Sequence, residues 1–288
     1  RATMSPSGVR RPRPRRAATE EAIIFTDPQP RAALVIGHPG HELRVHHWIE
    51  RTHPLVFVLT DGSGHTGVSR LASTTAVLER AGATPGSIYG RLSDREVYRA
   101  ILDGNVDLFA GLADELAAAL DRAEIGCVVG DAVEGFNPGH DVCRLVINAA
   151  LLRSSRHPAN FEFPLEAAPE DCPPEGRAEA IRLELDGDAL QRKLAAAAGY
   201  PEMAHEMERA LANHGRASFG VEHLRPVRYG LEIGGRHPQP PFYETYGEKQ
   251  VAAGIYREVI RFRDHMAPLA EGLGRRAARG GLIACASS

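Results

Sequence analysis

Ala32-Ala33-Leu34-Val35-Ile36-Gly37 leads directly into His38-Pro39-Gly40-His41-Glu42, and this junction is the basis of the fold prediction. An uncharged apolar run followed by Pro and Gly is typical of a buried strand that ends in a loop. In open α/β sheets, ligands bind outside the carboxyl ends of the parallel strands. His38 and His41 are therefore predicted to lie at the functional edge of a sheet.

Short apolar runs alternate with helical patterns through the first half of the chain. Further strands are predicted at residues 55–60, 87–90 and 125–130. Apolar residues recur at helical spacing between them, which predicts helices at 42–51, 68–81, 94–102 and 106–123. Strands separated by helices imply right-handed βαβ units. The sequence thus predicts an α/β, Rossmann-like fold with a mostly parallel central sheet flanked by helices.

The second half is predicted to extend this core as a helical and irregular C-terminal extension. Residues 164–176 are rich in Pro, Glu and Asp and are interpreted as a surface excursion. A strand at 180–185 is predicted, with helices at 188–198, 201–212 and 248–269. We expect one α/β domain over 30–271, with its core at 30–160 and its extension at 161–271. The basic residues 1–29 are expected to form a disordered tail and 272–288 a flexible one.

Composition narrows the class of partner. The net charge is −3 over 288 residues, and there is no apolar run of about 18 residues, so neither nucleic acid nor a membrane is expected as partner. The four cysteines form no CxxC pair, and Cys127 and Cys143 lie in apolar segments, where we expect them to be buried. A cytoplasmic protein with a small-molecule substrate is expected, and the sequence leaves a homo-oligomer open.

A second histidine-containing loop follows the fourth predicted strand. It reads Asn137-Pro138-Gly139-His140-Asp141 and precedes a predicted helix. Zinc is commonly held by imidazole nitrogens, with one position left open in catalytic sites. His38, His41 and His140 are therefore candidate ligands for Zn²⁺ or another divalent metal. Spacing alone is weak support among 13 histidines, and the histidines outside these two loops are interpreted as surface or packing residues.

These motifs resemble those of the PIG-L/LmbE-like zinc N-deacetylases. The first loop resembles the family's His-Pro-Asp-Asp-Glu loop, and the second resembles its His-Pro-Asp-His loop. Leu59-Thr60-Asp61-Gly62-Ser63-Gly64 resembles its Thr-Asp-Gly segment. Tyr243-Glu244-Thr245-Tyr246-Gly247-Glu248, with Gly254-Ile255-Tyr256, is similar to a tail seen in some longer members. The resemblance implies a Rossmann-like zinc enzyme, with the metal ligands on His38, His41 and His140.

The resemblance also shows where this chain departs from the family. The middle metal ligand changes from a carboxylate to the imidazole of His41, and the family's general-base aspartate falls on Gly40. The histidine and aspartate that assist the family's tetrahedral intermediate fall on Asn137 and Gly139. A site with three imidazoles is more positive and should acidify bound water further, so it needs less help from a base. We expect Gly40 to leave open space beside the metal.

Three carboxylates within the motifs are candidate catalytic proton carriers: Glu42, Asp61 and Asp141. Each also has a structural interpretation. Glu42 could orient a ligand, Asp61 could hold an Asp-Gly turn, and Asp141 could stabilise the first turn of its helix through the dipole.

Three functions remain open at this point. The first is a zinc-dependent hydrolase, similar to the deacetylases and amidases, that cleaves an amide or ester-like bond of a small polar, sugar-containing or secondary metabolite through metal-activated water. The second is a metal-dependent lyase, hydratase or other tailoring enzyme on the same fold. The third is a catalytically decayed binding protein. The loss of the family's base predicts weak or absent activity on plain N-acetyl sugars.

Overall fold

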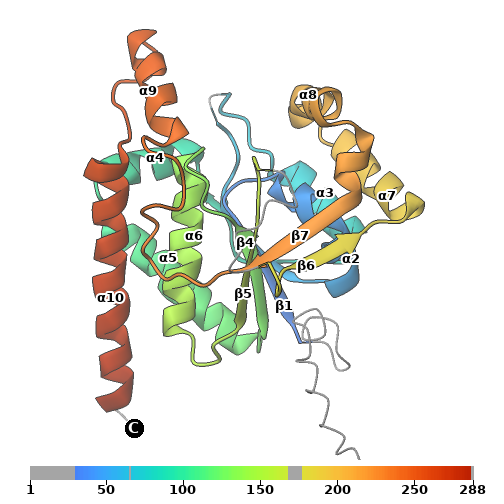
Figure 1. The fold of residues 1–288 in the computed structure, drawn as a ribbon. Helices are drawn as coiled ribbons and strands as arrows, with labels where there is room; N and C mark the ends of the chain where they lie inside the picture. The colour runs from blue at the N-terminus through green and yellow to red at the C-terminus, as the bar shows by residue number, and fades with distance from the viewer. Residues whose placement is uncertain (1–29, 65, 168–176, 287–288) are drawn as a thin grey trace, which may run out of the picture.

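The computed structural model describes residues 30–64, 66–167 and 177–286. The tail expected at 1–29 and most of the excursion expected at 164–176 therefore lie outside the described residues. Figure 1 shows a central sheet with helices on both of its faces. Seven strands form this sheet in the order β3-β2-β1-β4-β5-β7-β6. The predicted Rossmann-like architecture is confirmed.

Five parallel strands make the core of the sheet, and their order positions the functional edge. They are β1 (Ala32–Ile36), β2 (Leu55–Thr60), β3 (Thr84–Leu92), β4 (Cys127–Asp131) and β5 (Ala159–Phe163). The chain builds outward from β1 to β3 and then returns to place β4 on the other side of β1. This reversal creates a topological switch point between β1 and β4, where such sheets bind ligands.

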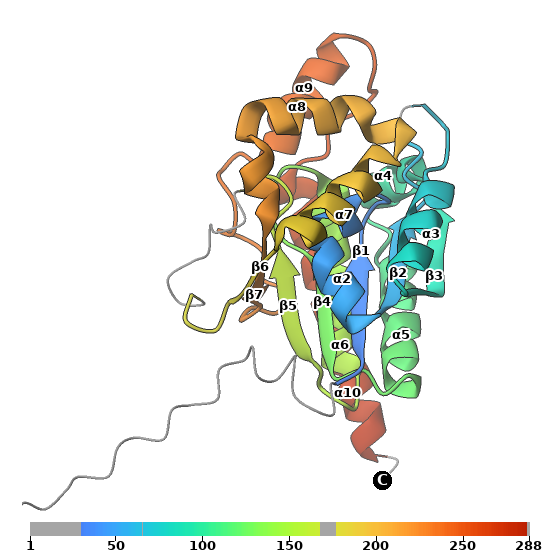
Figure 2. The ribbon, with the colours of Figure 1, turned by 90° about the vertical axis from the view of Figure 1, so that its right-hand side faces the viewer.

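Two antiparallel strands complete the sheet beyond β5. They are β6 (Ile181–Glu184) and β7 (Val221–Pro226). The connection between them contains α7 (Gly187–Ala198), η3 (Pro201–Met203), α8 (Ala204–His214) and η4 (Arg216–Gly220). Figure 2 shows α7 and α8 above the carboxyl ends of the parallel strands. This insertion therefore covers one side of the functional edge.

Alternate residues of the strands pack into two separate cores, as the two-residue period of a strand requires. Val35 and Phe57 face one core, and Leu34 and Val56 face the other. The first core is covered by α4 (Asp94–Leu102), α5 (Val106–Arg122), α6 (Pro138–Arg153) and α10 (Ala267–Ala286). The second is covered by η1 (His41–Val45), α2 (His46–Thr52) and α3 (Leu71–Arg80). Apolar residues on both sides explain the continuous apolar runs of β1 and β4.

The C-terminal part differs from the expectation. The single helix predicted at 248–269 is wrong, because α9 (Phe242–Ala252) ends before Gly254, which has a φ of +71°. The chain then passes through η5 (Phe262–Met266) into α10, which continues through residues 272–286, where we expected a flexible tail. Strands β5 and β7 were not predicted. Cys127 and Cys143 are buried, as expected.

No helix in the described ranges is long and apolar enough to cross a bilayer.

A buried ion pair ties the insertion to the sheet and gives a stability prediction. The Lys193 ammonium lies 2.9 Å from the Glu222 carboxylate, which also accepts hydrogen bonds from the backbone of His47 and Trp48. Glu222→Gln leaves a buried ammonium without its counter-charge, so we expect a loss of about 3 kcal/mol in unfolding free energy. Chemical denaturation measures this loss.

The matched control is Glu184→Gln, which removes an exposed partner of Arg182. Exposed pairs contribute at most about 1 kcal/mol, so the control should denature close to the native protein. Equal losses in the two variants would contradict the structural role given to Glu222.

Candidate metal centre

The loop after β1 is fixed to the end of β4 by one buried carboxylate. The Gly37 backbone N–H donates to Oδ2 of Asp131 over 2.7 Å, and the same oxygen lies 2.9 Å from Nδ1 of His41. Asp131 is fully buried at the carboxyl end of β4. The chain then turns at Gly40, whose φ of +106° strains any residue with a Cβ. The His41 ring is thus oriented across the switch point by the neighbouring strand.

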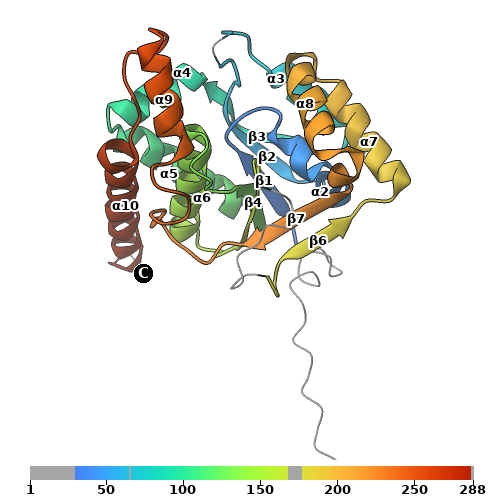
Figure 3. The same ribbon diagram turned by 45° about the horizontal axis from the view of Figure 1, so that its top comes forward.

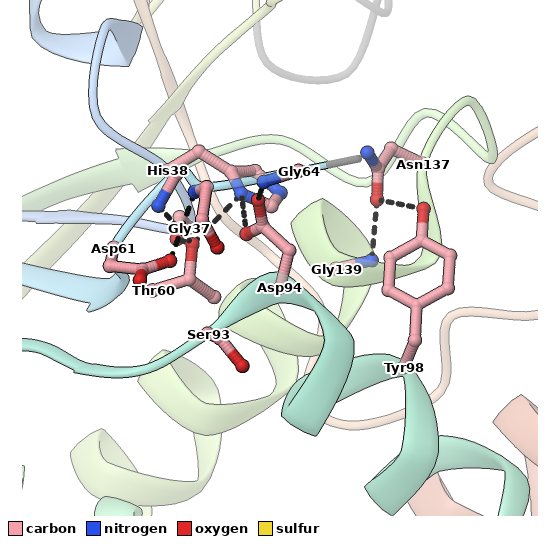
Figure 4. Close-up of polar contacts among 12 residues, drawn as sticks. Gly37, His38, Thr60, Asp61, Gly64, Ser93, Asp94, Tyr98, Asn137 and Gly139 are labelled. Atoms are coloured by element: carbon pink, nitrogen blue, oxygen red, sulfur yellow. Dashed lines mark hydrogen bonds and ion pairs between the residues drawn. The ribbon is translucent and has the colours of Figure 1, made fainter. Parts of the chain in front are cut away.

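A second carboxylate orients the His38 ring. Nδ1 of His38 lies 2.8 Å from Oδ1 of Asp94 and 3.0 Å from Oγ1 of Thr60, as Figure 4 shows. The other Asp94 oxygen accepts from the Gly64 backbone. Burial alone would raise the pKa of Asp94, but its hydrogen bond to His38 holds the pKa well below the usual range. A neutral ring that donates from Nδ1 carries its lone pair on Nε2.

The third ring comes from the start of α6. Asn137 caps this helix, because its side chain accepts from the Gly139 N–H over 2.8 Å, and Pro138 occupies the first turn. His140 is therefore carried by a rigid helix end. Burial, together with the nearby His41 and His38, lowers the pKa of His140 well below its ordinary value. A neutral imidazole is the form that binds metal.

The three rings converge on one region. Their centroids lie 5.3 Å apart for His38 and His41, 5.0 Å for His38 and His140, and 4.5 Å for His41 and His140. Three imidazoles on one tetrahedral zinc at 2.0–2.1 Å would place their ring centres about 5 Å apart. The backbone therefore already brings the predicted ligands to the spacing that such a centre requires.

The donor atoms support the same interpretation. Nε2 of His38 and Nδ1 of His140 are buried and have no hydrogen-bond partner. A buried polar atom without a partner costs about 1–3 kcal/mol, which a bound cation would offset. No group of three or more His, Cys, Asp or Glu side chains in the described ranges is already arranged to hold a metal ion. The rings fit zinc in type and in the spacing of their centroids, and their role as ligands stays a prediction.

Glu42 lies outside the group of rings. Its buried carboxylate accepts from the Gly40 backbone over 2.7 Å and from the Tyr200 hydroxyl, which also contacts Thr74. Burial raises the pKa of Glu42. These contacts match the interpretation in which Glu42 stabilises the loop, and its proton-carrying role stays a prediction.

Asp61 and Asp141 also hold their own loops. Asp61 accepts from the Ser63 backbone over 2.9 Å, which closes the expected turn. One oxygen of Asp141 accepts from the backbone of Glu134 and Gly135 at 3.2 and 3.3 Å, while the other is buried without a partner. Burial raises the pKa of Asp141 to about 7. Among the three predicted proton carriers in the described structure, only Asp141 has a buried oxygen without a hydrogen-bond partner.

The space expected beside Gly40 is filled. A Cβ at Gly40 would lie 2.3 Å from the Met203 sulfur. We expected open space because a sequence motif gives the size of a residue but not what packs against it. The residue that fills the space, Met203, lies in η3, more than 150 positions further along the chain. A Cβ at Gly139 would lie 3.0 Å from Nε2 of His38. Both glycines thus border the rings closely.

Asp94 and Asp131 are the two site residues that the sequence did not reveal. Asp131 directly follows the strand predicted at 125–130, and a polar residue at that position of a parallel sheet was the available signal. Asp94 was hidden because acidic residues are common in the first turn of a helix. Carboxylates that orient metal-ligating imidazoles are typical partners in zinc sites.

A cavity opens beside the rings. Its volume is about 650 Å³, and Gly40, His41 and His140 are among the residues that line it. The insertion supplies much of the remaining wall, including Met203 and Met207. Desolvation lowers the pKa of Arg44, which also lines the cavity, although its side chain keeps exposed surface. The rings are thus accessible to a ligand through this cavity.

A row of aromatic rings accounts for part of the tail motif. Phe136 and Phe242 stack with centroids 4.7 Å apart, and Tyr246 and Tyr256 continue the row. All four rings are partly exposed, between 37% and 48%. Figure 3 shows α9, which carries two of them, across the carboxyl ends of the strands from α8. The C-terminal extension therefore forms a second wall beside the functional edge.

Asp94→Asn tests the carboxylate support. Losing the negative charge weakens the hydrogen bond that orients His38, so we expect zinc affinity to fall about 10–100-fold. Competition against a chromophoric chelator measures this change. The control is Asp103→Asn. Asp103 lies at the exposed end of the same helix, where it pairs with Arg99, so its replacement should leave zinc affinity unchanged. A normal affinity in Asp94→Asn would contradict the proposed arrangement.

Comparisons with known proteins support the fold. No family model matches the chain, and no curated protein matches it. A triple mutant of a deacetylase of the teicoplanin biosynthetic pathway is 18% identical, with a TM-score of 0.51, and the match covers 68% of this chain and 97% of that one. The A40926 pseudoaglycone deacetylase Dbv21 is 18% identical, with a TM-score of 0.50 and coverages of 70% and 98%. The zinc-inhibited form of teicoplanin deacetylase Orf2 is 15% identical, with a TM-score of 0.50 and coverages of 69% and 100%. The chain shares the fold of these deacetylases.

Proposed function

We propose that this protein is a zinc-dependent hydrolase of the deacetylase and amidase type, acting on an amide or ester-like bond of a small polar metabolite. The observation that carries the proposal is the meeting of His38, His41 and His140 at the switch point, with carboxylates behind two of the rings. The deacetylase descriptions of the structures that share this fold support it, as does the zinc-inhibited form of one of them.

The chain's own residues would divide the work as follows. The three imidazoles would hold zinc, and Asp94 and Asp131 would keep two of the rings in the binding orientation. Zinc supplies Lewis-acid polarisation of the substrate carbonyl and acidifies water. The cavity would bring the scissile bond beside His41 and His140 and exclude bulk water from it.

Proton transfer is the step for which this chain lacks the family's residue. We favour Asp141 among the three candidates, because one of its oxygens is buried without a partner and its pKa of about 7 suits proton exchange near neutral pH. Glu42 and Asp61 are the other two candidates. If Asp141 carries the proton, Asp141→Asn should remove one ionisation limb from the pH–rate profile while zinc content stays at one ion per chain.

A reaction other than amide hydrolysis is the second candidate. The Met203 side chain stands where a base at position 40 would project, so no carboxylate at this position assists departure of an amine. A lyase or hydratase on the same metal centre would not need it.

The test of the proposed function is release of amine from N-acyl substrates by zinc-loaded protein. Chelation should abolish the release, and added zinc should restore it. Plain N-acetylglucosamine should react weakly, because no carboxylate occupies position 40. Absence of zinc-dependent amine or alcohol release across amides and esters would contradict the proposal.

A further inference from the structure

The cavity beside the candidate metal centre is lined by two chemically different kinds of side chain. Besides His41 and His140, charged side chains such as Arg44, Glu206 and Arg209 line it. Many of the others are aliphatic, aromatic or thioether side chains, among them Leu43, Leu194, Met203, Met207 and Phe219. A volume of about 650 Å³ lies within the range of pockets that enclose small organic ligands. The apolar side chains suit a hydrocarbon chain, and methionine side chains adapt well to such a ligand.

A cationic side chain lies in the same cavity. Arg44 projects from η1, one turn after His41, and lines the cavity with it. Two other cationic side chains, Arg209 and Lys193, also line the cavity, and Lys193 is already bound to Glu222 and to the Arg44 carbonyl. Among the described residues, no carboxylate lies within ion-pair distance of the Arg44 guanidinium, although Glu166 and Glu134 interact with it electrostatically. Arg44 can therefore receive an anionic group from a ligand.

We propose, on the basis of the hydrolase function above, that this cavity is an acyl-binding pocket for substrates with an unbranched chain of several carbons. The apolar walls bind the chain, and Arg44 binds the carboxylate after cleavage. In that cleavage water adds to the amide carbonyl carbon, the C–N bond breaks, the nitrogen takes up a proton, and an amine and a carboxylate leave. A guanidinium beside the new carboxylate matches its charge and planar geometry. The preferred substrate class is thus N-acyl, with a chain longer than acetyl.

A homologous series of carboxylates tests this pocket without any dependence on catalysis. Acetate, butanoate, hexanoate and octanoate are titrated into the chelated full-length protein by calorimetry. Each buried methylene contributes about 0.8 kcal/mol, so Kd should fall about fourfold per added methylene until the cavity is full. Chelation removes zinc, so the measured affinity reports binding of the carboxylate by protein side chains and not by the metal.

Two variants separate the chain from the head group. Ala210→Phe fills the cavity from α8, so it should remove the dependence on chain length. Ala212→Phe adds the same ring at an exposed position of that helix and should keep the dependence. Arg44→Gln should weaken binding of every carboxylate by a common factor of about 10 or more, whereas Arg122→Gln, at the opposite edge of the sheet, should have no effect.

The outcomes distinguish the pocket from the proposed function. A Kd that does not change with chain length, or equal effects of Ala210→Phe and Ala212→Phe, would overturn the acyl pocket and leave a zinc hydrolase for short acyl groups. A Kd that falls steeply with chain length, in a protein that shows no zinc-dependent hydrolysis, would support the acyl pocket and overturn the hydrolase function. A steep dependence together with faster hydrolysis of longer N-acyl substrates would support both.

Discussion

Replacing His140 with alanine is expected to lower zinc affinity more than a hundredfold and to remove zinc-dependent hydrolysis. The loss should exceed the 10–100-fold effect of removing a residue that only orients a ligand. His140 is buried, its ring lies within 5.0 Å of the other two ring centroids, and its Nδ1 has no hydrogen-bond partner. A chelator competition titration on folded protein measures the affinity.

The control for this variant is His205→Ala on α8. His205 is exposed, and its replacement should change neither zinc affinity nor activity. Unfolding curves of both variants establish that the native fold is kept. Retention of normal zinc affinity by folded His140→Ala would show that the ion, if bound, is held elsewhere.

Restoring the missing carboxylate should have the second largest effect, but only with a compensating change. Gly40→Asp alone places a Cβ against the Met203 sulfur at a backbone conformation with φ +106°, so little gain is expected. Aspartate tolerates positive φ better than most residues, and Met203→Ala removes the obstruction. Since a positioned acid or base typically contributes about 10²–10⁴-fold, Gly40→Asp/Met203→Ala should hydrolyse an N-acetyl substrate at least about a hundredfold faster than the native protein.

Three measurements make this result interpretable. Met203→Ala alone enlarges the cavity without adding a carboxylate and should not raise the rate. Zinc content must match that of the native protein, and kcat should rise more than KM falls. An unchanged kcat in the double variant with zinc bound would show that position 40 does not face the reacting bond.

The fold could be predicted from sequence because its information is local and repeated. Apolar runs that alternate with helical patterns predict the buried strands β1, β2 and β4. The parallel arrangement follows because helices connect these strands. Strands β5 and β7 were missed because their residues mix charged and apolar types, as in Ala159–Phe163. The break between α9 and α10 depends on one glycine that the apolar pattern alone did not resolve.

The convergence of the three histidine rings also followed from sequence, since each comes from a loop at the carboxyl end of a central strand. The support behind the rings did not. Asp131 and Asp94 act through contacts that join residues 90 and 56 positions apart, which no local pattern encodes. The same is true of Met203, whose packing against Gly40 depends on how the insertion folds over the sheet.

X-ray absorption at the zinc edge, measured on protein loaded with one equivalent of zinc, tests directly whether the three imidazoles bind the ion. We expect three imidazole nitrogens at about 2.0–2.1 Å with an oxygen ligand completing the shell, and fewer imidazoles in His38→Ala, His41→Ala and His140→Ala alike. Sulfur in the coordination shell, or a spectrum that any one of these variants leaves unchanged, would contradict it.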